Sequence, residues 1–366
     1  MKVEQFLLER WLQKYDPIAN YNLGHASGIP VKLGTFLDRL DEDLDIHYTA
    51  GNGEERLREE VSHLYSDIDK DNILITNGTT EANYLTANYL IDAGEEVVVI
   101  MPTYPQFPAV LRNIGANVKT FEITAENAAN PDLDKLQELV TSKTKVITFT
   151  NPNNPIGYIF YEDNLKRICQ IAEDVGAYVW ADEIFRGLEY EGGTPPTLLD
   201  LYEKAIVTSG LSKMALAGLR IGWVASDKEI VNGIWHFKDY TSTCNAAVSE
   251  HIAILALEGG NIINLRERCK RITLEPLAVL TDWIEKRKDV FSWFKPRAGY
   301  VAFPQCRLDV DTRQFCIELV EEMGVLLTPG DCFGFPDHIR IGYGKVDRKT
   351  LSEALELVDN LIERYK

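Results

Sequence analysis

Five groups of polar residues in the middle of this chain contain side chains that could do chemistry. Each group directly follows a short apolar run, and the five are Asn77–Thr80, Tyr104, Asn151–Gly157, Asp182 and Ser209–Lys213. Together they supply a primary amine, a carboxylate, amides, hydroxyls and an aromatic ring. Lysine is the only side chain that carries the primary amine needed to bond an aldehyde carbon. The chemistry depends on whether the fold brings these groups together.

Seven short apolar runs must position these groups. They are residues 73–76, 97–101, 118–121, 146–150, 178–181, 205–208 and 221–225. Several are near-continuous in valine and isoleucine, as strands covered on both faces are. Stretches with helical spacing lie between most of them, at residues 80–90, 104–113 and 164–175. This alternation predicts an α/β fold with a mostly parallel seven-stranded sheet, so the five groups should share one cleft beyond the carboxyl ends of the strands.

The pattern changes after about Arg271. Helical spacing returns at residues 273–290, 312–323 and 348–365, with short strand-like runs at 299–303, 325–328 and 338–343 between them. This mixture predicts a smaller α+β domain, with which the first forty residues should pack. We therefore expect a large domain at residues 41–270 and a small domain formed by residues 1–40 plus 271–366.

Composition excludes several classes of partner. The formal net charge of the 366 residues is -18, and such an acidic surface repels nucleic acid and anionic membranes. The six cysteines form no CxxC pair, so we expect no metal site and a reducing compartment. The N-terminal stretch lacks the apolar core of a signal peptide, and no later run is long enough to span a bilayer. These features favour a cytoplasmic protein.

Four motifs in a fixed order resemble the class I/II aminotransferases that use pyridoxal 5'-phosphate (PLP), which have the aspartate aminotransferase fold, or fold type I. The motifs are NPNNPIG, ADEIFRG, SGLSKMALAGLRIGW and HIRIGYG, at residues 151–157, 181–187, 209–223 and 338–344. The resemblance runs from about residue 40 to the C-terminus. It implies a PLP-dependent aminotransferase that moves an amino group between an amino acid and a 2-oxo acid through a Schiff base on Lys213.

The resemblance also implies contacts to the cofactor ring. Asp182 would pair with the pyridine nitrogen and keep the ring protonated. Asn154 would donate a hydrogen bond to the ring oxygen, and Tyr104 would lie flat against the ring. The alternative is that Asp182 caps a helix, that Asn154 is a plain turn residue and that Tyr104 only packs in the core.

The cofactor phosphate and the substrate have their own implied contacts. Gly78, Thr79 and Thr80 open a helix whose N-terminus would bind the phosphate, aided by Ser212 and Arg220. Arg340 would bind the substrate carboxylate through two parallel hydrogen bonds. The same substrate site would include Gly28 and Asn154. The alternatives are a surface charge for Arg220 and a salt-bridged strand residue for Arg340.

Tyr48 resembles a family residue that reaches the cofactor phosphate of a partner subunit. The resemblance therefore implies a homodimer with shared active sites. The alternative is a tyrosine that only packs a turn.

Two departures from the family pattern affect the site. Phe185 stands where many relatives carry tyrosine, so one hydrogen bond to the ring oxygen is missing and the pKa of the imine should rise. Four residues separate Lys213 from Gly218 where most relatives have five, so the turn toward Arg220 must be shorter.

Fold alone does not fix the reaction, so two alternatives to transamination stay open. The N-terminal stretch around Ser27 and Gly28 is distantly similar to enzymes of the capreomycidine synthase type. The first alternative is therefore a PLP-dependent lyase, decarboxylase or cyclase. The second is a non-catalytic protein with the same fold.

Overall fold

A seven-stranded sheet forms the centre of the protein, of which the computed structural model describes residues 3–366. Its strands are β2 (Ile73–Asn77), β3 (Glu96–Met101), β4 (Asn117–Glu122), β5 (Thr144–Thr150), β6 (Tyr178–Asp182), β7 (Ala205–Gly210) and β8 (Ile221–Ala225). Their order in the sheet is β2-β8-β7-β6-β5-β3-β4. Only β8 pairs antiparallel with its neighbours β2 and β7, so the predicted seven-stranded, mostly parallel sheet is confirmed.

Alternation along the strands sends side chains into two separate cores. In β3, Val97 and Val99 pack on one face, together with helices α3 (Thr79–Leu90), α4 (Gln106–Ile114) and α7 (Lys228–Lys238). Val98 and Ile100 pack on the other face, which is covered by α5 (Leu133–Leu139), α6 (Glu162–Glu173) and α8 (Ala247–Leu257). Both faces are apolar, which is why the strands read as continuous valine and isoleucine runs.

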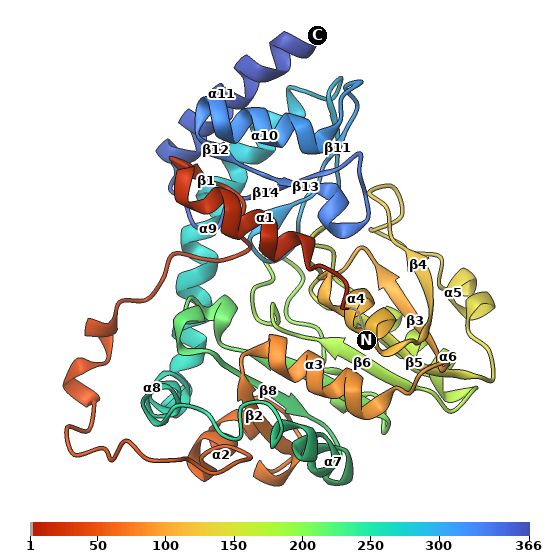
Figure 1. Ribbon diagram of the computed structural model, residues 1–366, viewed down its shortest axis with the longest axis vertical. Helices are drawn as coiled ribbons and strands as arrows, with labels where there is room; N and C mark the ends of the chain where they lie inside the picture. Colours follow the sequence, from red (N-terminus) through yellow and green to blue (C-terminus); the bar gives the residue numbers. More distant parts are fainter. Residues whose placement is uncertain (1–2) are drawn as a thin grey trace.

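A smaller set of elements lies above this sheet (Figure 1). Strand β1 (Tyr21–Asn22) pairs with β12 (Val325–Leu326), β9 (Phe291–Ser292) pairs with β11 (Gln305–Cys306), and β14 (Ile339–Gly342) lies between β10 (Val301–Ala302) and β13 (Thr328–Pro329). Helices α1 (Leu7–Tyr15), α10 (Thr312–Met323) and α11 (Arg348–Tyr365) pack around them. The N-terminal strand β1 thus pairs with a strand from the C-terminal part of the chain.

Helix α9 (Asn261–Glu285) joins the two parts and begins twelve residues before the helix predicted at 273–290. Its first twelve residues bury only Ile262 and Cys269, so they carry little apolar periodicity. The domain boundary expected at 270 falls inside this helix and stays a prediction. The run at 325–328 is two strands, because β12 pairs with β1 while β13 pairs with β14.

An extended segment between β1 and α2 (Glu55–Ser62) runs down the side of the molecule past α8 (Figure 1). It contains two short 3-10 turns, Leu33–Thr35 and Leu37–Arg39. The Arg39 guanidinium donates a hydrogen bond to the Leu255 carbonyl in α8. No helix within residues 3–366 combines the length and apolar character needed to cross a membrane.

Candidate active site

A cavity of about 730 Å³ lies at the carboxyl ends of the parallel strands and is bordered by the N-terminal helix. Of the residues predicted for the site, ten line it: Thr79, Thr80, Tyr104, Asn154, Asp182, Phe185, Ser212, Lys213, Arg220 and Arg340. The predicted groups therefore do share one cleft. Arg220 belongs to it because β8 runs antiparallel, which places the start of β8 at the edge where the other strands end.

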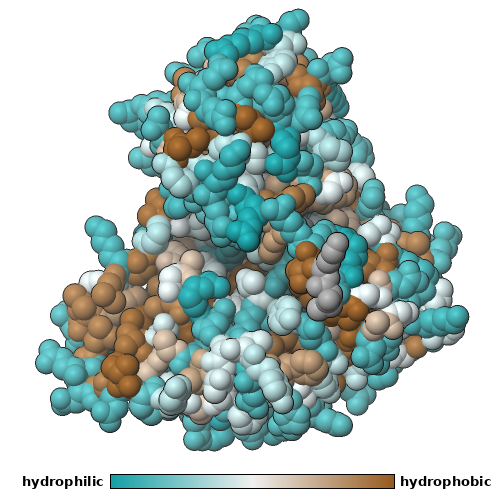
Figure 2. All heavy atoms as spheres, in the orientation of Figure 1, coloured by the Kyte–Doolittle hydropathy of each residue, from teal (hydrophilic) through white to brown (hydrophobic). Residues whose placement is uncertain are grey.

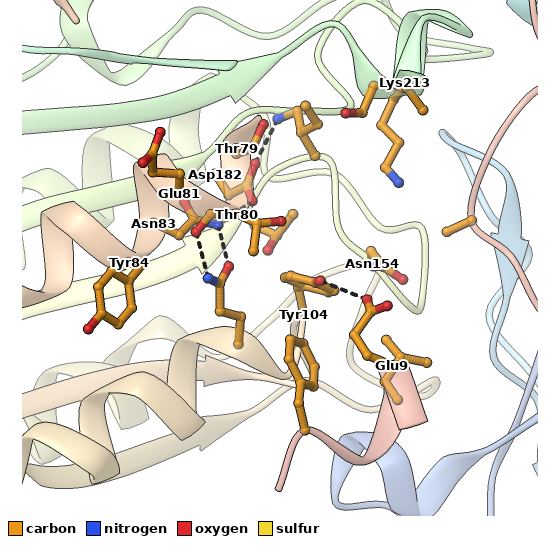
Figure 3. A pocket seen from close by; sticks show the side chains of 18 of the residues that line it. Glu9, Thr79, Thr80, Glu81, Asn83, Tyr84, Tyr104, Asn154, Asp182 and Lys213 are labelled. Carbon is orange, nitrogen blue, oxygen red and sulfur yellow. Dashed lines mark hydrogen bonds between the residues drawn. The ribbon is translucent and has the colours of Figure 1, made fainter. Parts of the chain in front are cut away.

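Lys213 projects its amine into the middle of this cavity (Figure 3). It lies in the 3-10 turn Ser212–Met214 directly after β7, and its backbone carbonyl accepts a 2.6 Å hydrogen bond from the Tyr300 hydroxyl. The amine is 5.6 Å from the centre of the Phe185 ring. Burial, with help from the positive charge of Arg340, lowers the pKa of Lys213 to about 8. A fraction of the amine is therefore uncharged and nucleophilic near neutral pH.

Asp182 ends β6, and the residue is only 3% exposed. It accepts hydrogen bonds from the Asn83 amide at 3.2 Å and from the Ile184 N–H at 2.9 Å. Burial raises the pKa of Asp182 to about 6, although these donors and the Lys213 charge oppose the rise. A buried carboxylate that no cation contacts directly fits a cationic ring nitrogen as its partner.

Asn83 was not predicted as a site residue. Its side-chain oxygen accepts a 2.6 Å hydrogen bond from the Thr208 hydroxyl, so its NH₂ group is turned toward Asp182. Asn83 lies four residues after Thr79, on the same face of α3. A polar residue one turn into a helix that opens on the cleft is the signal that could have revealed it.

The start of α3 forms a polar cradle with the loop before β8. Gly78 begins the helix with φ at +76°, and a Cβ there would lie 2.3 Å from Nη2 of Arg220. Arg220 donates to the Ser212 hydroxyl at 3.4 Å and to the Asn77 carbonyl at 3.4 Å. The shorter turn thus still brings Arg220 to Ser212, by placing Ala215 and Arg220 in left-handed conformations. Helix N–H groups beside a guanidinium fit a phosphate.

Arg340 is a buried cation that forms no ion pair with any acid within residues 3–366. It is 2% exposed in β14, and its guanidinium donates to the Gly24 carbonyl at 2.6 Å and to the Asn154 side-chain oxygen at 3.4 Å. Its Nε has no hydrogen-bond partner within the described residues. Burial lowers the pKa of Arg340, although the group stays charged at neutral pH. An incoming carboxylate would supply the missing acceptor.

Three predicted residues are not among those that line this cavity: Gly78, which precedes Thr79 at its edge, Tyr48 and Gly28. Tyr48 is 86% exposed, in the extended segment before α2. Gly28 lines an adjoining cavity of about 480 Å³, which also contacts Ser212 and Lys213. A Cβ at Gly28 would lie 3.1 Å from the Tyr300 hydroxyl oxygen.

Three further residues reach the site from distant parts of the chain. Glu9 of α1 accepts a 3.2 Å hydrogen bond from the Tyr104 hydroxyl, and His25 lines the cavity with Nε2 2.7 Å from the carboxylate of Asp16. Tyr300 fixes the Lys213 backbone as described above. None follows an apolar run of the sheet, so the strand-end pattern does not identify them.

The chain is similar to known aminotransferases over most of its length. The family model for "Aminotransferase class I and II" matches residues 29–358. A "Probable aspartate aminotransferase" of Methanocaldococcus jannaschii is 29% identical over 88% of this chain and 87% of its own length. Capreomycidine synthase of Streptomyces vinaceus is 27% identical over 93% of this chain and 88% of its own. The crystal structure of a PLP-dependent aminotransferase from Streptococcus suis superposes with a TM-score of 0.92 at 32% identity, covering 100% of this chain and 99% of that one.

These matches confirm the resemblance predicted from the four motifs, including the similarity to capreomycidine synthase. They favour transamination over a lyase, a decarboxylase, a cyclase or a non-catalytic protein. The substrates of such enzymes are an amino acid and a 2-oxo acid. The chain belongs to the class I and II aminotransferase family and is an enzyme that uses pyridoxal phosphate to transfer amino groups.

Proposed function

We propose that Lys213 holds the cofactor covalently and moves the proton of the reaction. When bound, PLP supplies an aldehyde carbon that takes up the amino group and a ring that withdraws electrons. The low pKa of Lys213 supports this role, because the amine must lose its proton before it can act as nucleophile or base. With its amine uncharged, Lys213 would be able to take a proton from the substrate Cα and later give it back.

Arg340 would orient the substrate by its carboxylate. The guanidinium is held by the Gly24 carbonyl and by Asn154, so its remaining N–H groups are fixed before the substrate arrives. This contact holds the substrate Cα within reach of Lys213, which lines the same cavity. The Asn154 oxygen faces Arg340, so the NH₂ group of Asn154 is turned away and can donate to the ring oxygen.

The remaining contacts to the cofactor ring and phosphate would come from the other predicted residues. Asp182 would pair with the ring nitrogen and keep it protonated, while Tyr104 would pack against the ring face. Gly78, Thr79, Thr80, Ser212 and Arg220 would bind the phosphate. The Thr79 hydroxyl already donates to the Ser209 carbonyl at 2.9 Å, so the backbone N–H groups and Thr80 would carry most of that contact.

One observation carries the proposal. An amine of lowered pKa, a buried carboxylate and a buried guanidinium with no ion pair among the described residues lie in the same cavity. Borohydride reduction of the holoenzyme, followed by peptide mapping, should place the cofactor on Lys213. Lys213→Ala should bind cofactor without a covalent link and should lose transamination. An adduct on another lysine would refute the assignment.

We also propose a homodimer whose active sites are shared. The extended segment exposes Leu33, Leu37, Ile46 and Tyr48, and the brown area at the lower left of Figure 2 coincides with this segment in Figure 1. An exposed apolar surface of this kind is typical of a protein interface. Sedimentation at micromolar concentration should give twice the mass of the chain, and a monomer would contradict the proposal.

The compartment is proposed as the cytoplasm. All six cysteines are free in the structure, and five of them are buried. Free thiols in this number support a reducing environment.

A further inference from the structure

Glu9 places a carboxylate in the active-site cavity. It lies in α1, and Figure 3 shows its side chain directed into the cavity from the side opposite the sheet. Its hydrogen-bond partner is the Tyr104 hydroxyl at 3.2 Å, which holds the carboxylate there. No basic side chain within residues 3–366 forms an ion pair with it, whereas Glu4 of the same segment pairs with Arg112 at 2.9 Å.

The other acids of the cavity are already engaged. Glu81 accepts hydrogen bonds from the Asn77 N–H at 2.6 Å and from the Thr241 hydroxyl at 2.7 Å. Asp182 is held by Asn83 and Ile184 and is proposed to meet the cofactor ring. Among the described acids of this cavity, Glu9 therefore has the fewest partners: one neutral hydrogen-bond donor and no ion pair, although its charge works to raise the pKa of Lys213 and of Arg340.

The basic residues of the cavity are likewise assigned. Of the lysines and arginines that line it, Lys213 would carry the cofactor, Arg220 the phosphate and Arg340 the substrate carboxylate. No arginine or lysine among the residues lining this cavity is left for a second carboxylate. A substrate with an acidic side chain would instead meet the negative charge of Glu9. Like charges in a confined site weaken binding, whereas opposite charges attract.

We propose that Glu9 is a specificity-determining residue that selects amino acids whose side chains carry a positive charge, such as a guanidinium or an ammonium group. The proposal rests on the proposed function, since Arg340 must take the substrate carboxylate for the side chain to extend toward Glu9. Tyr104 positions the carboxylate, so the cofactor-stacking ring and the specificity residue are linked by one hydrogen bond.

Two isosteric substrate pairs test the proposal. L-arginine and L-citrulline have nearly the same shape but differ in charge, and L-glutamate and L-glutamine differ in the opposite sense. With the wild-type holoenzyme, kcat/KM should be about 10- to 100-fold higher for arginine than for citrulline, and lower for glutamate than for glutamine. The difference should lie mainly in KM, because the charged contact is made in the ground state as well.

Three variants separate charge from structure. Glu9→Gln keeps an oxygen that can accept from Tyr104 but removes the charge, so the arginine to citrulline ratio should fall toward one. Glu9→Lys should reverse the preference, with glutamate favoured over glutamine. Glu4→Gln, which removes a carboxylate of the same segment outside the cavity, is the matched control and should keep the wild-type ratios.

A binding experiment without turnover makes the outcome independent of catalysis. Calorimetric titration of the holoenzyme should show 5-guanidinopentanoate binding about 10-fold or more tightly than its neutral isostere 5-ureidopentanoate, and Glu9→Gln should remove the difference. Equal values within each pair for the wild type, or ratios that Glu9→Gln leaves unchanged, overturn the role of Glu9. If no amino acid reacts at all, the proposed function fails, while the titration still decides whether Glu9 recognises a cation.

Discussion

Burial disfavours the ionised form of the Asp182 carboxyl group. A carboxylate in such an unfavourable environment indicates a functional role. Its pKa of about 6 in the fold exceeds the usual 3.8, because the carboxylate is desolvated. The folded protein therefore binds the proton more tightly than the unfolded chain does. The stability that this proton provides is complete below pH 3.8 and is lost as the pH rises to about 6.

Asp182→Asn should consequently stabilise the cofactor-free protein at pH 7.5. The difference between a pKa of 3.8 and one of about 6 corresponds to about 3 kcal/mol at most, so unfolding by urea should need a higher concentration in the variant. At pH 3.5 the gain should vanish. In the presence of PLP the order should reverse, because the variant lacks the partner of the ring nitrogen. Equal stability of both cofactor-free proteins at pH 7.5 would argue against a buried ionised Asp182.

Phe185 offers a second prediction for a single residue. Its ring is buried and its centre lies 5.6 Å from the Lys213 amine, so a phenol at this position would lie in the part of the cavity where the family resemblance implies a donor to the cofactor ring oxygen. Phe185→Tyr should lower the pH at which the visible absorption of the bound cofactor changes, since a donor stabilises the deprotonated form. Spectral pH titrations of the two holoenzymes compare the midpoints, and equal or reversed midpoints would contradict the idea.

At the scale of elements, the start of α3 depends on the direction of β8. Because β8 is the antiparallel strand, Arg220 at its beginning meets Gly78 at the end of β2. A side chain at Gly78 would displace the Arg220 guanidinium, whereas Gly94, which also has positive φ, has no atom within 4 Å of its Cβ position. A comparison of variants at the two glycines therefore distinguishes the effect of local backbone strain from the effect of losing the phosphate cradle.

Gly78→Ala should weaken PLP binding by about 10-fold or more, in line with a lost charged contact. Gly94→Ala should cost about 1 kcal/mol of stability for the left-handed backbone but leave PLP affinity unchanged. Equilibrium titration of each cofactor-free protein with PLP measures the affinity. A Gly78→Ala variant with wild-type affinity would show that the phosphate binds elsewhere.

At the scale of the whole molecule, the position of Tyr48 has a consequence for subunit mixing. Tyr48 lies outside the cavity of its own chain, so in a shared site Lys213 would come from one subunit and Tyr48 from the other. A dimer of one Lys213→Ala chain and one Tyr48→Phe chain would then hold one site with both defects and one site with neither.

Mixed dimers should therefore be more active, per intact Lys213 and at limiting PLP, than Tyr48→Phe homodimers. Wild-type chains mixed with Lys213→Ala chains serve as the control and should keep the wild-type activity per intact Lys213. If the mixture is no better than Tyr48→Phe alone, although the homodimer is impaired, Tyr48 acts within its own chain.

The sequence by itself determined the seven strands of the central sheet and several of the helices. Valine-rich runs and helical spacing are short-range patterns, and they located β2 to β8, α10 and α11 within a few residues. Polar residues directly after those runs identified the cleft, because parallel strands end at one edge, and the four motifs identified the family.

Only the tertiary structure decided which distant residues complete the site. Glu9 and Arg340 are 331 positions apart, yet both line the cavity, since α1 packs against the C-terminal elements. The burial of Arg340 without an ion pair among the described residues, and the direction of β8 that brings Arg220 to Gly78, are likewise products of long-range packing. Local periodicity indicates which face of an element is apolar, but it does not indicate which other element will cover that face.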